Sequence, residues 1–144
     1  MTDRYTPFRP RLARVVSLAV AAVAVVLTVV LVVALPELGA LDKAGFAGLA
    51  ILIGWFCWRQ ADVHATPDEA GITVRNLVQR RRLAWADIVS VRFGQGRPWV
   101  QLDLVDGDTL AVMGIQRADG PFANREARRL ATLVAQHTTT SRDD

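Results

Sequence analysis

The chain has 144 residues, room for one ordinary domain and an additional segment, and 51% of them are hydrophobic. The mean hydropathy of +0.24 is high for a soluble domain. The formal charge is +3, which permits an anionic partner without requiring one. The single cysteine, Cys57, excludes an internal disulfide and a metal site built from several cysteines.

The first apolar stretch covers residues 15–35, reads VVSLAVAAVAVVLTVVLVVAL and carries no charge. A helix of this length spans about 31 Å, the thickness of a bilayer core. We therefore predict a transmembrane helix over 15–35, preceded by a basic N-terminus at 1–14. The alternative is a cleaved secretory signal, whose apolar region is usually ~7–15 residues long and is followed by small residues. Pro36 and Glu37 interrupt such a cleavage site here.

A second apolar stretch, AGFAGLAILIGWFCW at 44–58, follows a short segment at 36–43 that contains proline and glycine. It predicts a second transmembrane helix, which begins near residue 38 if the flanking residues are included. Trp55 and Trp58 lie at its far end, where an aromatic belt is expected. A buried core helix is the alternative. The alanines and glycines of this stretch would allow close packing against the first span or against a second copy of the chain.

Arginines flank the outer ends of the two predicted spans, whereas the segment between them carries both signs of charge. Four arginines precede the first span, and Arg59 follows the second. The connecting segment holds Glu37, Asp42 and Lys43. Because cytoplasmic flanks are rich in arginine and lysine, we predict a two-span plasma-membrane protein with both termini in the cytoplasm and 36–43 as a short outer loop.

From residue 59 onward apolar residues become intermittent and turn signals recur, which indicates one small β-rich domain over 59–137. Alternation and turn residues predict six short strands or, with a further break, seven. The six lie at 61–66, 71–76, 78–84, 88–93, 99–105 and 110–116.

The dipeptide Asp-Gly at 106–107 is the strongest hairpin signal in the chain. A two-residue turn at this dipeptide places Leu102 opposite Ala111. The same register places Val100 opposite Met113.

Residues 124–137 (NREARRLATLVAQH) carry an apolar stripe opposite an arginine-rich face, the pattern of an amphipathic helix. The polar tail at 138–144 is expected to be disordered. The chain is thus predicted to be α+β, with two transmembrane helices followed by a curled antiparallel sheet that the last helix covers. The stripe consists of Ala123, Ala127, Leu130, Ala131 and Val134.

Two N-terminal spans, a strand directly after the second, the segment TPDEAGITVRN and then RLAWADIVSVRF resemble the bacterial pleckstrin-homology-like (PH-like) family. The chain is similar in particular to small actinobacterial membrane proteins that include a low-molecular-weight culture-filtrate antigen of mycobacteria. The resemblance covers 61–137. It implies a curled β-barrel of about seven strands capped by a C-terminal helix.

Arg80, Arg81 and Arg82 are candidate contacts for anionic lipid headgroups, because the domain begins a few residues after Trp58. An arginine near an anionic leaflet contributes about 1 kcal/mol to binding. In a strand, however, the first and third arginines share one face and the second lies on the other, so a solvated strand end is the alternative. The resemblance also implies basic residues in the first hairpin loop of phosphoinositide-binding PH domains, whereas 67–71 (PDEAG) is acidic here.

Trp85 lies between two alanines and is predicted to anchor the core, since an aromatic ring fills a small β-domain efficiently. Trp99, beside a glycine-rich loop, is a candidate contact for a partner or for headgroups. The other predicted core residues are Ile88, Val100, Leu102, Leu130 and Val134.

The sequence contains no nucleophile elbow, phosphate loop, calcium loop or nucleic-acid-binding motif. We therefore predict no catalytic residue, metal, cofactor or nucleic acid partner, and a small membrane enzyme is the weakest of three alternatives. The preferred one is a membrane-anchored binding or scaffold module that recruits or steadies a protein of the membrane or envelope machinery. The second is a sensor of anionic lipid headgroups at the inner leaflet.

Overall fold

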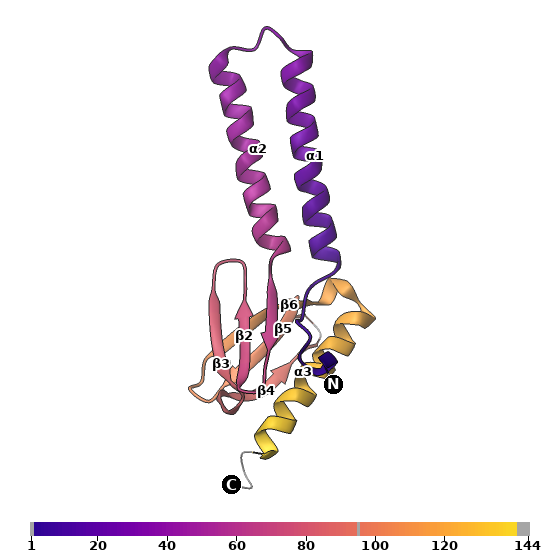
Figure 1. Ribbon diagram of the computed structural model, residues 1–144, viewed down its shortest axis with the longest axis vertical. Helices are drawn as coiled ribbons and strands as arrows, with labels where there is room; N and C mark the ends of the chain where they lie inside the picture. The colour runs from indigo at the N-terminus through magenta and orange to yellow at the C-terminus, as the bar shows by residue number, and fades with distance from the viewer. Residues whose placement is uncertain (1, 95, 141–144) are drawn as a thin grey trace. The chain divides into compact units, whose positions relative to one another are not determined.

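The computed structural model describes residues 2–94 and 96–140, which separate into two units. One unit is a pair of helices within Leu12–Asp62. The other combines the N-terminal segment up to Arg11 with the chain from Val63 onward (Figure 1). The chain therefore passes between the two units twice, once before the first helix and once after the second.

The helical unit consists of α1 (Leu12–Ala34) and α2 (Ala40–Ala61). Both helices are long and apolar enough to span a membrane, and only 6% of the most apolar segment of each is buried. The interpretation of the second stretch as a buried core helix is therefore wrong. The Thr28 hydroxyl in α1 is satisfied internally, because Oγ1 donates to the Ala24 carbonyl at 2.8 Å.

The glycines of α2 do not pack against α1. A methyl group built at Gly45, Gly48 or Gly54 would meet no atom within 4 Å. The expected role of these glycines in packing the two spans of one chain together is therefore wrong, whereas Ala50 of the same stretch does lie beside Ala24 and Leu27 of α1. The use of the glycines in packing against a second copy stays a prediction.

In its described residues, the second unit contains six strands in two antiparallel sheets, with orders β1-β2-β3 and β4-β5-β6. The expected closed barrel of about seven strands is corrected to two open three-stranded sheets. The first strand also begins later than expected, because α2 continues through Ala61. The strands are β1 (His64–Pro67), β2 (Gly71–Arg75), β3 (Arg80–Ala84), β4 (Ile88–Arg92), β5 (Trp99–Leu104) and β6 (Thr109–Gln116).

The predicted register of the β5–β6 hairpin is wrong by one residue. Leu102 pairs with Leu110, and Val100 pairs with Val112. A two-residue turn would have turned Leu110 and Val112 away from the core, whereas the observed four-residue loop buries both. Burial of the larger apolar side chains thus decides the register, and Gly107 still supplies the positive φ, at 88°.

The N-terminal segment is part of the β-rich unit and not only a basic leader to the first helix. Phe8 is fully buried, and its N–H and carbonyl pair with Ala65 of β1 at 2.8 and 3.0 Å. The guanidinium of Arg129 lies 3.8 Å from the centre of the Phe8 ring and donates to the Thr6 carbonyl at 2.9 Å. Phe8 therefore extends the first sheet by one bridge on its β1 side.

A close backbone approach explains one glycine of β6. A Cβ atom at Gly114 would lie 2.7 Å from the Phe8 carbonyl oxygen. This position therefore requires glycine for the N-terminal segment to reach β6.

The last helix, α3 (Pro121–Thr140), begins at a proline, whose fixed φ suits the first helical position. Its buried face comprises Ala123, Ala127, Leu130, Leu133 and Val134. Ala131, expected in this stripe, is instead exposed. The predicted disordered tail lies outside the described residues from 141 onward, and 138–140 are helical. Three short 3-10 helices complete the unit at Thr2–Tyr5, Trp85–Asp87 and Arg117–Asp119.

Candidate functional site

The three consecutive arginines lie on β3, an edge strand, and do not form one cationic patch. Arg82 forms an ion pair with Asp68 at 2.8 Å, and Arg81 lies 3.6 Å from Asp106 in the β5–β6 loop. Among the residues that the structure describes, Arg80 is the member of the run without an ion pair. Two of the three charges are therefore partnered within the chain.

Asp68 holds the turn between β1 and β2. Its Oδ1 accepts hydrogen bonds from the backbone N–H groups of Ala70 and Gly71 at 2.8 and 2.9 Å. The hydrogen bond from Arg82 lowers the pKa of Asp68 to about 2, and this effect outweighs the burial that acts in the opposite direction. The first hairpin loop is thus fixed by a carboxylate, which agrees with its acidic sequence.

Trp85 lies in the core, with 4% of its surface exposed. Its indole N–H donates to the Asp68 carbonyl at 2.9 Å, and its ring stacks on His137 with 4.8 Å between ring centres. The Tyr5 hydroxyl lies 3.2 Å from His137 Nε2. The remaining residues expected in the core, Ile88, Val100, Leu102, Leu130 and Val134, are all buried in the same cluster.

Trp99 is half-buried at the start of β5, opposite Gln116 of β6. It lines neither of the two hollows described below. The structure thus does not bring Trp99 together with the arginine run on β3, which belongs to the other sheet.

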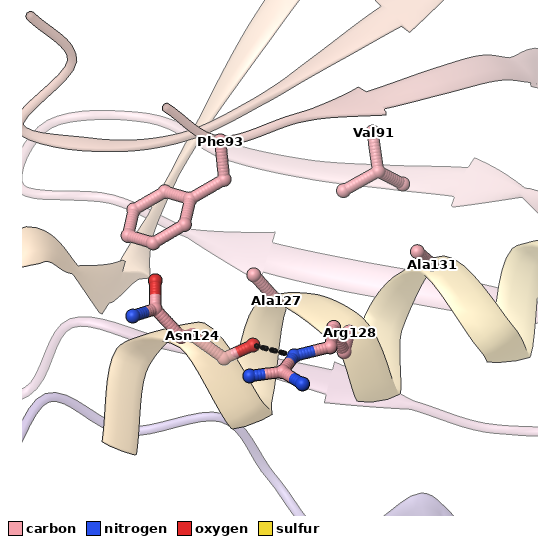
Figure 2. A pocket seen from close by; sticks show the side chains of 6 residues that line it. All are labelled: Val91, Phe93, Asn124, Ala127, Arg128 and Ala131. Carbon is pink, nitrogen blue, oxygen red and sulfur yellow. Dashed lines mark hydrogen bonds between the residues drawn. The ribbon is translucent and has the colours of Figure 1, made fainter. Parts of the chain in front are cut away.

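A hollow of about 320 Å³ lies between β4 and α3 (Figure 2). Val91 and Phe93 are two residues apart, so they project from the same side of the strand. They face Ala127 and Ala131 on the helix across the hollow. Because the helix presents only methyl groups at these two positions, space remains between the helix and the strand.

A second hollow of the same size adjoins the first and shares Phe93 and Asn124 with it. The charged residues lining the two hollows are Arg128 in the first and Arg117 in the second. Within the described part of the chain, no acidic side chain lines either hollow. We call the two hollows together the β4–α3 groove.

The groove follows an edge of the second sheet. In the order β4-β5-β6, β4 has one neighbouring strand, so its other edge is not paired within the sheet. The opposite edge, on β6, is partly covered, because the Asn76 side chain bonds the Ala111 carbonyl at 2.8 Å and the Met113 N–H at 3.1 Å.

Sequence reasoning did not identify the groove. Its only signal was the pair of alanines on the helix, which was interpreted as part of the buried stripe. Ala131 leaves a gap because its small side chain lies beside β4, and this could be recognised only after the helix had been placed on the sheet.

Within the described residues, 2–94 and 96–140, no three histidine, cysteine, aspartate or glutamate side chains lie together as a candidate metal site. Cys57 is buried within the helical unit.

The aspartates near the β5–β6 loop have local roles. Asp106 Oδ1 accepts from the Asp108 N–H at 2.9 Å, and Asp103 pairs with Arg92 at 2.5 Å.

Two apolar helices, two small antiparallel sheets and a C-terminal helix define the general class, an α+β protein with two candidate membrane spans and a small β-rich domain. Residues 63–132 match the family model described as "Bacterial PH domain". Bacterial PH domains are typically binding modules without catalytic activity. The N-terminal segment that carries Phe8 lies outside the matched range.

The chain is also similar to proteins of mycobacteria. An uncharacterized protein of Mycobacterium bovis and one of Mycobacterium tuberculosis are each 34% identical to it over 68 residues. The alignment covers 47% of this chain and 44% of each relative, so the chain spans less than half the length of these curated relatives. No solved structure matches the chain significantly.

Proposed function

We propose that the protein is a membrane-anchored PH-like binding module that recruits or steadies a protein partner at the inner face of the plasma membrane. The observation that carries the proposal is the connection of one PH-like domain to both outer ends of a pair of apolar helices. A domain attached at Arg11 and at Val63 requires both of these ends to lie on one side of a membrane. The arginine-rich flanks favour the cytoplasmic side.

A non-catalytic role is supported by the similarity to bacterial PH domains. It is also supported by what the polar side chains do. Asp68 holds a turn, Asp103 pairs with Arg92, and His137 stacks on a buried tryptophan. Each of these groups has a structural partner within the described part of the chain. The narrower kinship with the mycobacterial culture-filtrate antigen stays part of this proposal.

Site-specific photo-crosslinking in intact cells tests recruitment. A photoreactive amino acid at Ala131, in the groove, is compared with one at Thr132, the neighbouring exposed residue outside the groove lining. The experiment is repeated with the helical pair replaced by an unrelated anchor of the same topology. If a discrete protein adduct forms with the native helices and is lost with the unrelated anchor, the PH-like domain alone does not recruit the partner. An adduct retained with the unrelated anchor supports recruitment by the domain, and the absence of any adduct from surface positions around the domain contradicts it.

The alternative is an anionic-lipid sensor, and the exposed Arg80 favours it. Hydrogen exchange of the β3 amides in the full chain separates the two functions. A lipid sensor predicts stronger protection in nanodiscs that contain anionic lipid than in zwitterionic nanodiscs, and loss of the difference in Arg80→Ala. A protein-recruiting module predicts equal protection in both kinds of nanodisc.

A further inference from the structure

We infer that the β4–α3 groove binds an extended, acidic segment of a partner protein, which adds as a strand to the free edge of β4. This inference rests on the proposed function and names the kind of partner that it requires. Its first support is the unpaired edge of β4. A strand with one neighbour exposes a row of backbone N–H and C=O groups that an incoming chain can pair with.

The other exposed strand edge is less suitable. The outer edge of β3 carries Arg80 and Arg82 as exposed residues, and charged side chains on an edge discourage pairing with another strand. On β4 the corresponding positions include Val89, of which 62% is exposed, and the half-buried Ser90 and Val91. The one charged side chain of β4, Arg92, is paired with Asp103, so an incoming strand meets an edge with fewer free charges than that of β3.

The groove supplies the specificity that backbone pairing lacks. A strand added beside β4 projects alternate side chains on the face that carries Val91 and Phe93, toward α3. Small apolar side chains of the incoming strand fit against Ala127 and Ala131 there. Each hollow measures about 320 Å³, the low end of the ~300–1,000 Å³ of small-molecule sites, which suits single side chains better than a cofactor.

Charge selects an acidic segment. Arg128 and Arg117 line the groove, and within the described residues neither has a carboxylate partner. The guanidinium of Arg128 is turned toward the Asn124 carbonyl, with Nε at 3.3 Å, as Figure 2 shows. Carboxylates of an incoming chain would form stronger, charge-assisted hydrogen bonds with these groups.

Charge also disfavours a second copy of the chain as the occupant. Pairing of two β4 edges would bring the arginines of both grooves together, and like charges across an interface cost binding energy. Arg92 does not add to the free charge, because it is paired with Asp103 at 2.5 Å. A partner with the opposite charge is the occupant that the groove favours.

The probe is a synthetic, fluorescently labelled peptide with a Val-Thr-Val-Thr centre and two acidic residues at each end. Binding to the full chain in zwitterionic nanodiscs is measured by anisotropy, and the amides of 88–92 are followed by hydrogen exchange. We expect binding with increased protection of β4. A peptide with proline in its centre, which cannot complete the ladder, and one with lysines at its ends should bind at least about tenfold more weakly.

Four variants of the chain locate the site. Ala131→Trp fills the groove from an exposed helical position and should weaken binding about tenfold, whereas Ala135→Trp, one turn further on the same helix, should not. Arg128→Glu should weaken binding about tenfold, whereas Arg80→Glu, the same charge change on the other sheet, should not.

Equal losses from Arg128→Glu and Arg80→Glu would show unspecific attraction and overturn the inference. So would binding that Ala131→Trp leaves unchanged, β4 protection caused by anionic nanodiscs without peptide, or no binding of the acidic peptide. If the acidic peptide does not bind but a crosslink forms in cells from a surface other than the groove, the inference fails and the proposed recruitment function stands.

Discussion

Single residues show how this small domain uses its many charges. The consecutive arginines suggested a binding patch, but carboxylates in the β1–β2 turn and the β5–β6 loop pair with two of them. Thr73 and Asp68 both accept hydrogen bonds from Arg82, at 3.0 Å each. Such exposed pairs contribute little individually, so their main effect is to fix the geometry of the β1–β2 turn.

Replacement of Asp68 by asparagine should remove a contribution to stability that depends on pH in a defined direction. The pKa of Asp68 is lowered to about 2 from 3.8, so the carboxylate stabilises the fold above 3.8 and this contribution is lost as the pH falls toward 2. Because the pair is exposed, we expect a loss of only about 0.2–1 kcal/mol at neutral pH. Denaturant unfolding of the full chain in neutral detergent measures it.

The adjacent Glu69→Gln serves as the control, since Glu69 is exposed and has no ion pair within the described residues. The parent and Asp68→Asn should converge near pH 2. A difference that persists to this pH, or an equal effect of Glu69→Gln, would contradict the role of the Arg82 hydrogen bond.

At the scale of secondary structure elements, the N-terminal segment has the largest unexpected role. Its backbone bonds to β1, its aromatic ring lies in the core, and Arg129 of α3 contacts it. Arg11 adds a second attachment, because its N–H donates to Asp119 Oδ2 at 2.9 Å and its guanidinium lies 3.7 Å above the Phe122 ring. A truncated chain that starts after α2 would lack these contacts.

Phe8→Ala should therefore destabilise the β-rich unit by about 3–5 kcal/mol, the cost of removing a buried phenylalanine from a core. The same denaturant unfolding measures the change, with tryptophan fluorescence as the signal. Phe46→Ala on α2 is the matched control, because 38% of Phe46 is exposed. If the two substitutions shift the unfolding midpoint of the domain equally, the N-terminal segment does not contribute to its core.

At the scale of the whole molecule, the two passages of the chain between its units constrain membrane topology. One folded domain is built from the chain before α1 and the chain after α2. With an odd number of membrane crossings, the N-terminal segment and the chain after α2 would lie on opposite sides of the membrane. Phe8 and Ala65 could then not form their backbone hydrogen bonds. Two spans or none are therefore compatible with the fold, and the apolar surfaces of α1 and α2 favour two.

Cysteine labelling of intact cells tests this topology, since replacement of Cys57 by serine leaves a chain without cysteine. Single cysteines at Thr6, Glu37 and Thr139 are treated with a membrane-impermeant maleimide. We expect labelling at position 37 in intact cells, and labelling at 6 and 139 only after lysis. Labelling at 6 and 139 from outside would reverse the orientation, and a different result at 6 from that at 139 would exclude two spans.

The sequence by itself determined the two apolar helices, the β-rich domain and the amphipathic last helix, because each depends on a local pattern of apolar residues along a short stretch. The buried positions of Trp85, Val100 and Leu102 also followed from such patterns. Only the tertiary structure decided the hairpin register, the carboxylate partners of Arg81 and Arg82, the burial of Phe8 and the groove beside Ala131. These features arise from residues far apart in the chain, and their energies depend on which surfaces meet when the sheets and helix pack.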